Sequence, residues 1–294
     1  MSEPEPIEGL ELRRLRPGHV ANAEALSAEA GWNQTGADWR MMIEVGEGWG
    51  LWASPERLVA TALVLPYGDR FAWISMVLVT AAFRRRGIAG RLLRHCVDRV
   101  AARGLTPVLD ATEEGRKVYL GLGFRDVYGY HRRVANSPVP AGAPAAAPGT
   151  AAALRDMTEH DLPAVAAFDA QVFGADRSAV LAYLFARRPR HAVVAERAGA
   201  VCGFALAREG RLAHHLGPLI AEDGATAIAL ARRALRDTGG PVCADVPDDQ
   251  APFGDWLADS GFVPRRRFVR MILERTEPFD DPTHVYAVAG PELG

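Results

Sequence analysis

The feature that most constrains the fold is a turn rich in arginine and glycine, placed between an apolar run and an amphipathic segment. Residues 77–79 are Val-Leu-Val, the turn at 84–90 is RRRGIAG, and apolar residues then recur from 92 to 100 at helical spacing. This order predicts a strand, a turn and the N-terminus of a helix, whose first amides have no partner inside the helix. Because the helix dipole adds positive potential there, the turn is suited to a phosphate group.

Two other interpretations of this turn remain open on the residues alone. Three consecutive arginines are typical of a solvated charged surface. A nucleotide-binding turn of another type is the second alternative, but neither the G-x-G-x-x-G nor the G-x-x-x-x-G-K-[ST] pattern occurs in the chain. Gly87 and Gly90 favour the phosphate interpretation, because without a Cβ each lets an anion approach the backbone closely.

Composition limits the class of protein. With 294 residues the chain is long for one core and suits two domains of about 100–150 residues. It is 49% hydrophobic and 24% charged, and its net charge of −2 indicates neither a nucleic-acid nor a membrane partner. Its three cysteines lie far apart in apolar stretches, which predicts neither disulfides nor a metal site. The sequence shows no signal peptide and no apolar run of about 20 residues, so we expect a cytoplasmic protein.

The chain divides near its middle and repeats its order of elements. Residues 135–150 contain four prolines, six alanines and no charge, as expected of a linker. We therefore expect domains at 1–134 and 151–294, related by an internal duplication. In the first half the patterns predict strands at 8–15, 49–53, 57–66, 70–80, 106–111 and 124–134, and helices at 18–30, 35–45, 87–103 and 113–121. In the second half they predict strands at 151–156, 191–197, 200–208, 211–220, 241–245 and 262–274, and helices at 161–173, 177–187, 223–237 and 249–260.

Two motifs carry a resemblance to a known family. Arg84-x-x-Gly87-x-Ala89 resembles the signature that holds the CoA pyrophosphate in the GNAT superfamily of acyl-CoA N-acyltransferases, and Tyr119-x-x-Leu122-Gly123-Phe124 resembles a second motif of that superfamily. The paired halves and the last nine residues, YAVAGPELG, are similar to a group of bacterial tandem-GNAT proteins. The resemblance implies an α/β (α+β) fold of two tandem GNAT-like domains, each a mixed, mostly antiparallel sheet flanked by helices.

The resemblance also implies an activity. We expect an N-acetyltransferase in which an amine of a small molecule or amino-acid-like acceptor attacks acetyl-CoA directly in a ternary complex, since neither motif holds a nucleophilic Cys or Ser. A non-catalytic acyl-CoA sensor is the alternative. Acetyl-CoA and the acceptor are the expected partners, and no metal is expected. The residues implied to contact acetyl-CoA are Met76, Val77, Leu78, Val79, Arg84, Arg85, Arg86, Gly87, Ile88, Ala89, Gly90, Thr112 and Tyr119.

The family often uses a tyrosine at the position of Tyr119 to protonate the departing thiolate, and a phenol stays protonated at neutral pH. The alternative is that Tyr119 only packs its ring. Thr112 stands where many members have Asn, which leaves its role open. Asp110 is the first candidate for the general base, although an Asp at a strand end is often a helix cap. His131 is the second, with a surface position on an edge strand as its alternative.

The expected acceptor site is the loop that holds Trp32, Asn33 and Gln34, together with Asp38. These side chains could hold a ring or an ammonium group, but core packing of the tryptophans is an equal alternative.

The second half lacks the chemical positions of the first. Glu222 and Asp223 replace the arginine cluster and would repel a pyrophosphate, and Leu257 stands where the first half has Tyr119. The second half is therefore interpreted as a degenerate GNAT-like domain that serves in packing, in a homodimer or as a wall of the acceptor site.

Overall fold

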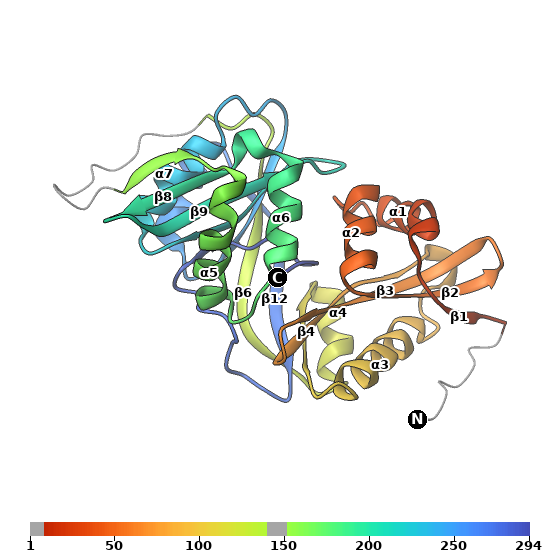
Figure 1. Cartoon of the computed structure of the whole chain (residues 1–294). Helices are drawn as coiled ribbons and strands as arrows, with labels where there is room; N and C mark the ends of the chain where they lie inside the picture. The colour runs from red at the N-terminus through yellow and green to blue at the C-terminus, as the bar shows by residue number, and fades with distance from the viewer. Residues whose placement is uncertain (1–8, 140–151) are drawn as a thin grey trace.

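A computed structural model describes residues 9–139 and 152–294 of the chain, so residues 140–150 of the expected linker lie outside the described residues. The described chain forms two lobes, each built mainly from one half of the sequence (Figure 1). Within it, hydrogen bonds join all strands into one thirteen-stranded sheet that passes through both lobes.

In the first lobe, α1 and α2 lie on one face of the sheet and α3 and α4 on the other (Figure 1). Thr35 begins α2 with a capping box: its amide donates to the Asp38 carboxylate at 2.7 Å, and its hydroxyl accepts from the Asp38 amide. The elements are β1 (Glu11–Arg14), the 3-10 turn η1 (Pro17–His19), α1 (Val20–Glu29), α2 (Gly36–Val45), β2 (Glu47–Ser54), β3 (Arg57–Tyr67), β4 (Phe71–Val79), η2 (Ala81–Phe83), α3 (Ile88–Ala101), β5 (Thr106–Ala111), α4 (Glu113–Leu120) and β6 (Phe124–Ala135).

The second lobe repeats this order and adds a short strand that the sequence did not predict, β13. Its elements are β7 (Ala153–Asp156), η3 (Glu159–Asp161), α5 (Leu162–Phe173), α6 (Ser178–Arg187), η4 (Pro189–His191), β8 (Val193–Arg197), β9 (Ala200–Arg208), β10 (His214–Ala221), α7 (Gly224–Ala234), β11 (Val242–Pro247), α8 (Ala251–Asp259), β12 (Val263–Leu273) and β13 (Val285–Ala287).

The strand order exchanges elements between the halves. It runs β1-β2-β3-β4-β5-β12-β6-β11-β10-β9-β8-β7, with β13 paired to β10. The penultimate strand of the chain, β12, thus lies between two strands of the first half and pairs antiparallel with both. β6 in turn pairs with β11 of the second half. The expectation that His131 lies on an edge strand is therefore wrong, because its strand β6 has a neighbour on each side.

Three buried clusters follow from this arrangement. One packs α3 against the first half of the sheet, through residues such as Ile88, Leu93 and Cys96. A second packs α7 and α8 against the second half. The third is shared by both lobes, since it includes Trp39 of α2, Trp73 of β4 and Leu184 of α6. A single apolar core between the lobes makes their contact part of the fold.

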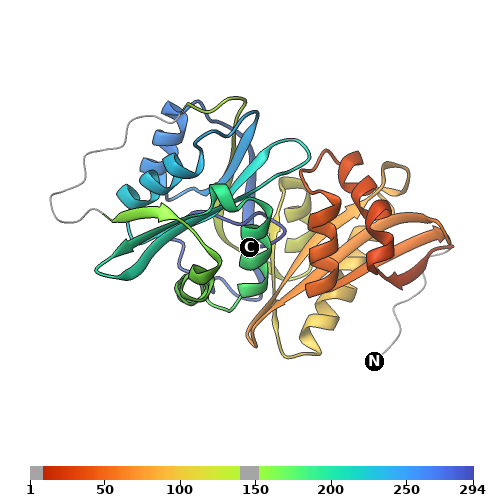
Figure 2. The ribbon, with the colours of Figure 1, turned by 45° about the horizontal axis from the view of Figure 1, so that its top comes forward.

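The sequence-based expectations for fold class and elements are confirmed. The fold is a mixed α/β structure whose sheet is mostly antiparallel and flanked by helices, and each predicted strand and helix is present within a few residues of its expected bounds. Residues 285–294 return to the junction of the two lobes, where residue 294 lies in both views (Figure 1 and Figure 2).

Candidate active site

The first feature of the candidate site is a gap in the sheet between β4 and β5. These parallel strands pair only from Phe71 to Trp73, opposite Thr106–Val108. Beyond that point β5 continues to pair with β12 on its other side, while β4 diverges from it. Among the described residues, the backbone groups of β4 after Trp73 that face β5 are therefore free to pair with a ligand.

A β-bulge at Met76 shapes the free edge of β4. The register with β3 shifts between Thr61 and Leu63, and Met76 has a positive φ of 52°. The Thr61 hydroxyl donates to the Met76 carbonyl oxygen at 2.9 Å and holds this conformation in the core. The segment Met76–Val79, expected to contact the cofactor, thus lies along the open side of the gap.

The Arg84–Gly90 turn joins this edge to the N-terminus of α3. Gly87 is the N-cap with φ 72°, and Arg85 also has a positive φ of 61°. Within residues 9–139 and 152–294, the backbone amides of residues 85–90 donate to no other group of the chain. Successive unpaired amides at a helix N-terminus form an anion-binding concavity.

The arginine side chains of the turn differ in their contacts. The Arg84 Nε donates to the carbonyl oxygen of Val79 at 2.9 Å, which ties the turn to the end of β4. Arg86 donates to the Ala82 carbonyl oxygen and lies over the ring of Phe83, 5.0 Å from its centroid. All three arginines are exposed, so their positive charge faces the solvent from which an anion would come.

Tyr119 lies on α4, next to the start of α3. A Cβ added at Gly90 would be 3.8 Å from Val118 Cγ1, which places the two helices in contact. The ring of Tyr119 packs over Gly115 and near Phe124, and burial raises the pKa of its phenol to about 12. Thr112 is the N-cap of α4, where its hydroxyl accepts from the Gly115 amide at 3.2 Å.

The two candidates for the general base, Asp110 and His131, each already bind another side chain. The Asp110 side chain is buried, and its two oxygens accept from Arg270 Nε and Nη2 at 3.0 and 3.1 Å. Burial raises the pKa of Asp110, and Arg270 partly offsets this. His131 lies on β6, and its Nδ1 is 2.6 Å from the carboxylate of Asp248, which follows β11. The base role of Asp110 stays a prediction.

The expected acceptor loop makes contacts with the second lobe. Asn33 is buried, donates to the Ala213 carbonyl oxygen at 2.9 Å and accepts from the amides of Leu212 and Ala213. The carbonyl oxygen of Trp32 accepts from Arg211 Nε at 3.0 Å. The loop at Trp32 and Asn33 thus binds the turn between β9 and β10 through these hydrogen bonds. Gln34 is also buried, but its Oε1 has no partner among the described residues.

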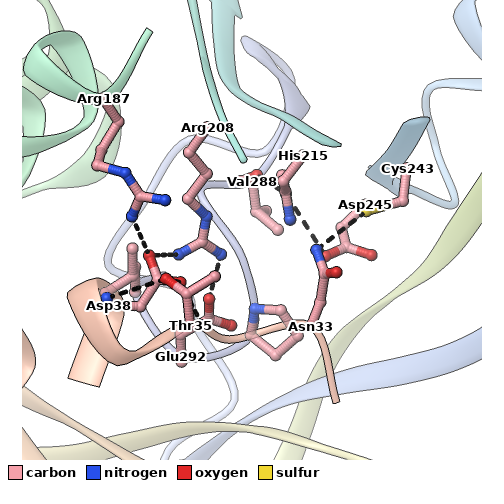
Figure 3. Close-up of polar contacts among 12 residues, drawn as sticks. Asn33, Thr35, Asp38, Arg187, Arg208, His215, Cys243, Asp245, Val288 and Glu292 are labelled. Atoms are coloured by element: carbon pink, nitrogen blue, oxygen red, sulfur yellow. Dashed lines mark hydrogen bonds and ion pairs between the residues drawn. The ribbon is translucent and has the colours of Figure 1, made fainter. Parts of the chain in front are cut away.

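Asp38 is the centre of a buried ion network (Figure 3). Its Oδ2 binds Thr35, and its Oδ1 accepts from Arg187 and Arg208, each at 3.1 Å, and from Tyr183 at 3.0 Å. Burial opposes ionisation of Asp38, but Arg208, the hydrogen bonds from Thr35, and Arg187 together outweigh it and lower the pKa of this carboxyl. The second guanidinium nitrogen of Arg208 binds Glu292, so one arginine joins both halves of the chain.

In the second lobe the corresponding gap is filled by the chain itself. β10 and β11 pair in parallel only over His214–Leu216 and then diverge. β13 enters the gap, pairs with Leu219 and Ile220 of β10, and the Val288 amide that follows it donates to the Asp245 carbonyl oxygen at 3.0 Å. A strand thus takes up the backbone groups that the first lobe leaves free.

The helix that follows β10 is also closed to anions. Asp223 caps α7 and accepts from the Thr226 amide at 2.8 Å, while Arg197 pairs with Glu222 and Asp223. A carboxylate therefore stands where a pyrophosphate would bind. Leu257, the counterpart of Tyr119, is fully buried and carries no proton to give.

Sequence reasoning missed Arg208, Arg270 and Glu292. Each is at most 2% exposed and forms an ion pair between segments distant in the sequence. A single arginine inside an apolar strand segment, as in FALAR or FVRMIL, was the available signal, because a buried charge requires a partner.

Two further findings concern the described part of the chain. It contains no helix that is long and apolar enough to cross a membrane. It also contains no group of three or more His, Cys, Asp or Glu residues arranged to hold a metal ion.

Comparisons with known proteins agree with this geometry. The profile of the acetyltransferase (GNAT) family matches residues 20–124, and that of an acetyltransferase (GNAT) domain matches residues 165–287, so that together they span more than half of the chain. The chain is 24% identical to YitH of Bacillus subtilis strain 168, an uncharacterized N-acetyltransferase, over 97% of this chain and 98% of that protein.

Two further likenesses cover most of the chain. It is 28% identical to the holothin acyltransferase of a Pseudoalteromonas species (strain SANK 73390), over 80% of this chain and 78% of that protein. The crystal structure of a candidate acetyltransferase from Pyrococcus horikoshii has a TM-score of 0.78 at 19% identity, and covers 100% of this chain and 99% of its own. At this low identity, the likeness to the Pyrococcus structure is evidence for the fold alone.

Proposed function

Because the chain belongs to the GNAT acetyltransferase family and carries a GNAT domain in each half, we propose that it is an N-acetyltransferase. In this proposal it transfers acetyl from acetyl-CoA to an amine of a small molecule or amino-acid-like acceptor. The observation that carries the proposal is the contrast between the halves. The first has an open gap beside a turn of unpaired amides, whereas the second has its gap filled by β13 and its helix capped by Asp223.

The donor would bind in the first half alone. Its pyrophosphate would accept hydrogen bonds from the amides of residues 85–90, with positive charge from Arg84–Arg86, and its pantetheine would pair with the free edge of Met76–Val79. Thr112 and Tyr119 lie on the helix that borders the turn. These contacts use the two groups of backbone atoms that have no partner among the described residues, the amides of the turn and the free edge of β4.

The proposed reaction is a direct transfer. The amine nitrogen attacks the thioester carbonyl carbon, a C–N bond forms, and the C–S bond breaks. Tyr119 gives its phenolic proton to the departing thiolate, and a raised pKa of about 12 keeps that proton available at neutral pH. The proton lost by the amine goes to a base, for which Asp110 stays the sequence-based candidate. The scheme needs no metal.

A non-catalytic acyl-CoA sensor is the second candidate. It is favoured by one observation: Arg270 already occupies both oxygens of Asp110, so that the base position has no free carboxylate. A sensor would bind acetyl-CoA in the same gap and transfer nothing. The cytoplasmic location, the homodimer and the division into domains at 1–134 and 151–294 also stay predictions.

Calorimetric titration of acetyl-CoA into the full chain tests the proposal. We expect one site per chain, and binding at least about tenfold weaker in Arg84→Ala, which removes a charge beside the amides. Two sites would contradict the assignment to the first half, and no binding would contradict the function. Release of free thiol in the presence of primary amines then separates the enzyme from the sensor.

A further inference from the structure

Residues 290–294 lie at the closed end of the gap between β4 and β5. Trp73, the last β4 residue that pairs with β5, donates from Nε1 to the Pro291 carbonyl oxygen at 3.0 Å. The hydroxyl of Tyr67 on β3 donates to the Leu293 carbonyl oxygen at 2.8 Å. Glu292 lies between these two anchors in the sequence, and Arg208 links it to Asp38 of α2.

The side chain of Glu292 has one oxygen in use and one without a partner. Glu292 is 2% exposed, and its Oε1 accepts from Arg208. Its Oε2 is buried and has no hydrogen-bond partner among the described residues. A Cβ added at Gly290 would be 2.9 Å from Oε2 and 3.0 Å from Arg208, so the carboxylate is held close over the backbone.

The two neighbouring arginines of the network, Arg208 and Arg187, already bind other groups. Arg208 uses Nη1 for Asp38 and Nη2 for Glu292 (Figure 3). Arg187 binds Asp38, Tyr183 and Glu209. Both oxygens of Asp38 are occupied as well. Glu292 Oε2 is therefore the open acceptor of this network.

A second acceptor without a donor belongs to the same region. Gln34 is 4% exposed, its Oε1 is unpartnered, and it directly precedes Thr35, which binds Asp38. A buried oxygen without a donor has lost its hydrogen bonds to water without replacement, which destabilises the fold, and more so when the oxygen is charged. Two such acceptors favour a ligand that brings N–H donors, and a cationic one forms the stronger hydrogen bond with a carboxylate.

We propose that Glu292 Oε2 binds the ammonium group of the acceptor, and that the acceptor is a primary amine without a carboxylate next to the reacting nitrogen. This inference rests on the proposed N-acetyltransferase function. A second carboxylate beside the ammonium would lie close to Glu292 in a buried site, where like charges repel strongly. Arg208 would not neutralise this second carboxylate, since the Arg208 guanidinium already binds Asp38 and Glu292.

The first test uses the wild-type full chain and matched probes. Phenethylamine is compared with phenylalanine, tyramine with tyrosine, and agmatine with arginine, by release of free thiol from acetyl-CoA. We expect kcat/KM at least tenfold higher for the member of each pair that lacks the α-carboxylate. Equal or faster acetylation of the amino acids, or acetylation of no amine by a protein that binds acetyl-CoA, would overturn the inference.

The second test removes the charge. Glu292→Gln keeps an acceptor for Arg208 but places an amide at the position of Oε2, so KM for the best amine is expected to rise at least tenfold. The affinity for acetyl-CoA, measured by calorimetry, is expected to stay unchanged. Glu209→Gln is the matched control, because this carboxylate lies at the edge of the network, half exposed, and pairs with Arg187 and Arg188.

The outcomes separate this inference from the function on which it rests. An unchanged KM in Glu292→Gln, or an equal rise in Glu209→Gln, would overturn the ammonium site while acetyl-CoA binding stands. Loss of acetyl-CoA binding in the wild type would instead overturn the function, and the inference with it. If Glu292→Gln does not fold, the matched amines still decide the matter in the wild type.

Discussion

Arg270 on β12 donates two hydrogen bonds to Asp110 on β5, at 3.0 and 3.1 Å, across 160 positions of the sequence. Arg270 also binds Asp280 and lies over the rings of Trp73 and Tyr128, 4.5 and 5.0 Å from their centroids. Asp110 and Arg270 have almost no exposure. This ion pair holds β12 against β5, beside the gap in which the acyl-CoA donor is proposed to bind.

Asp110→Asn is expected to lower the free energy of unfolding by about 3 kcal/mol, because it removes one partner of a buried ion pair. Asp126→Asn is the control, since Asp126 pairs with Arg116 on the surface and its loss is expected to cost less than about 1 kcal/mol. Denaturant unfolding gives both values, and equal losses would contradict the structural role. If Asp110 is also the base, kcat of the folded variant falls without a change in acetyl-CoA affinity.

Gly87→Glu is expected to weaken acetyl-CoA binding at least about tenfold, since it places a carboxylate beside the proposed phosphate site. Gly104→Glu at the other end of α3 is a matched control. The two glycines have φ of 72° and 70°, and a Cβ at either would meet nothing within 4 Å. The strain in the two variants is therefore equal, and only the distance to the turn differs. Equal affinities by calorimetry would rule out the turn as the phosphate site.

Tyr119→Phe is expected to lower kcat about a hundredfold with little change in acetyl-CoA affinity, because only proton donation is lost. Burial raises the pKa of Tyr119 to about 12, so the protonated acid persists to about that pH, rather than to its ordinary 10. The wild-type kcat with phenethylamine is therefore expected to show no loss through this group up to pH 10.5. A kcat that is unchanged in the variant would remove the acid role.

His215 predicts a pH dependence of stability. Burial lowers the pKa of this imidazole to about 4, and nearby Asp245 only partly opposes the shift. Between pH 6.5 and 4 the unfolded chain binds a proton that the folded chain does not, so stability falls as the pH falls through this window, by roughly 3 kcal/mol. Below pH 4 both states are protonated and the loss stays constant.

Denaturant unfolding at several pH values measures this slope. His215→Asn is expected to be less stable at pH 7 but to lose the slope between pH 6.5 and 4. His160→Asn, at an exposed position, is the control and is expected to keep it. A wild-type slope that persists in His215→Asn would assign it to other groups.

Local sequence patterns were enough to predict most of the proposed donor site in the first half of the chain. The strand, the Arg84–Gly90 turn and the helix could be predicted because periodicity and turn chemistry act between residues close in the chain. The capping role of Thr112, which stood open in the sequence, needed the position of the Gly115 amide. The carboxylates at Glu222 and Asp223 were visible as replacements, since like charges repel a phosphate in any fold.

Only the tertiary structure decided how the halves combine. The insertion of β12 between β5 and β6, the filling of the second gap by β13, and the contact of Arg208 with Glu292 join segments far apart in the sequence. Strand periodicity states which face of a strand is buried, but not which strand lies beside it. The sequence by itself therefore determined the elements, the family resemblance and the phosphate turn. The partners of each buried charge depended on the tertiary structure, because long-range pairing is set by the packing of the whole sheet.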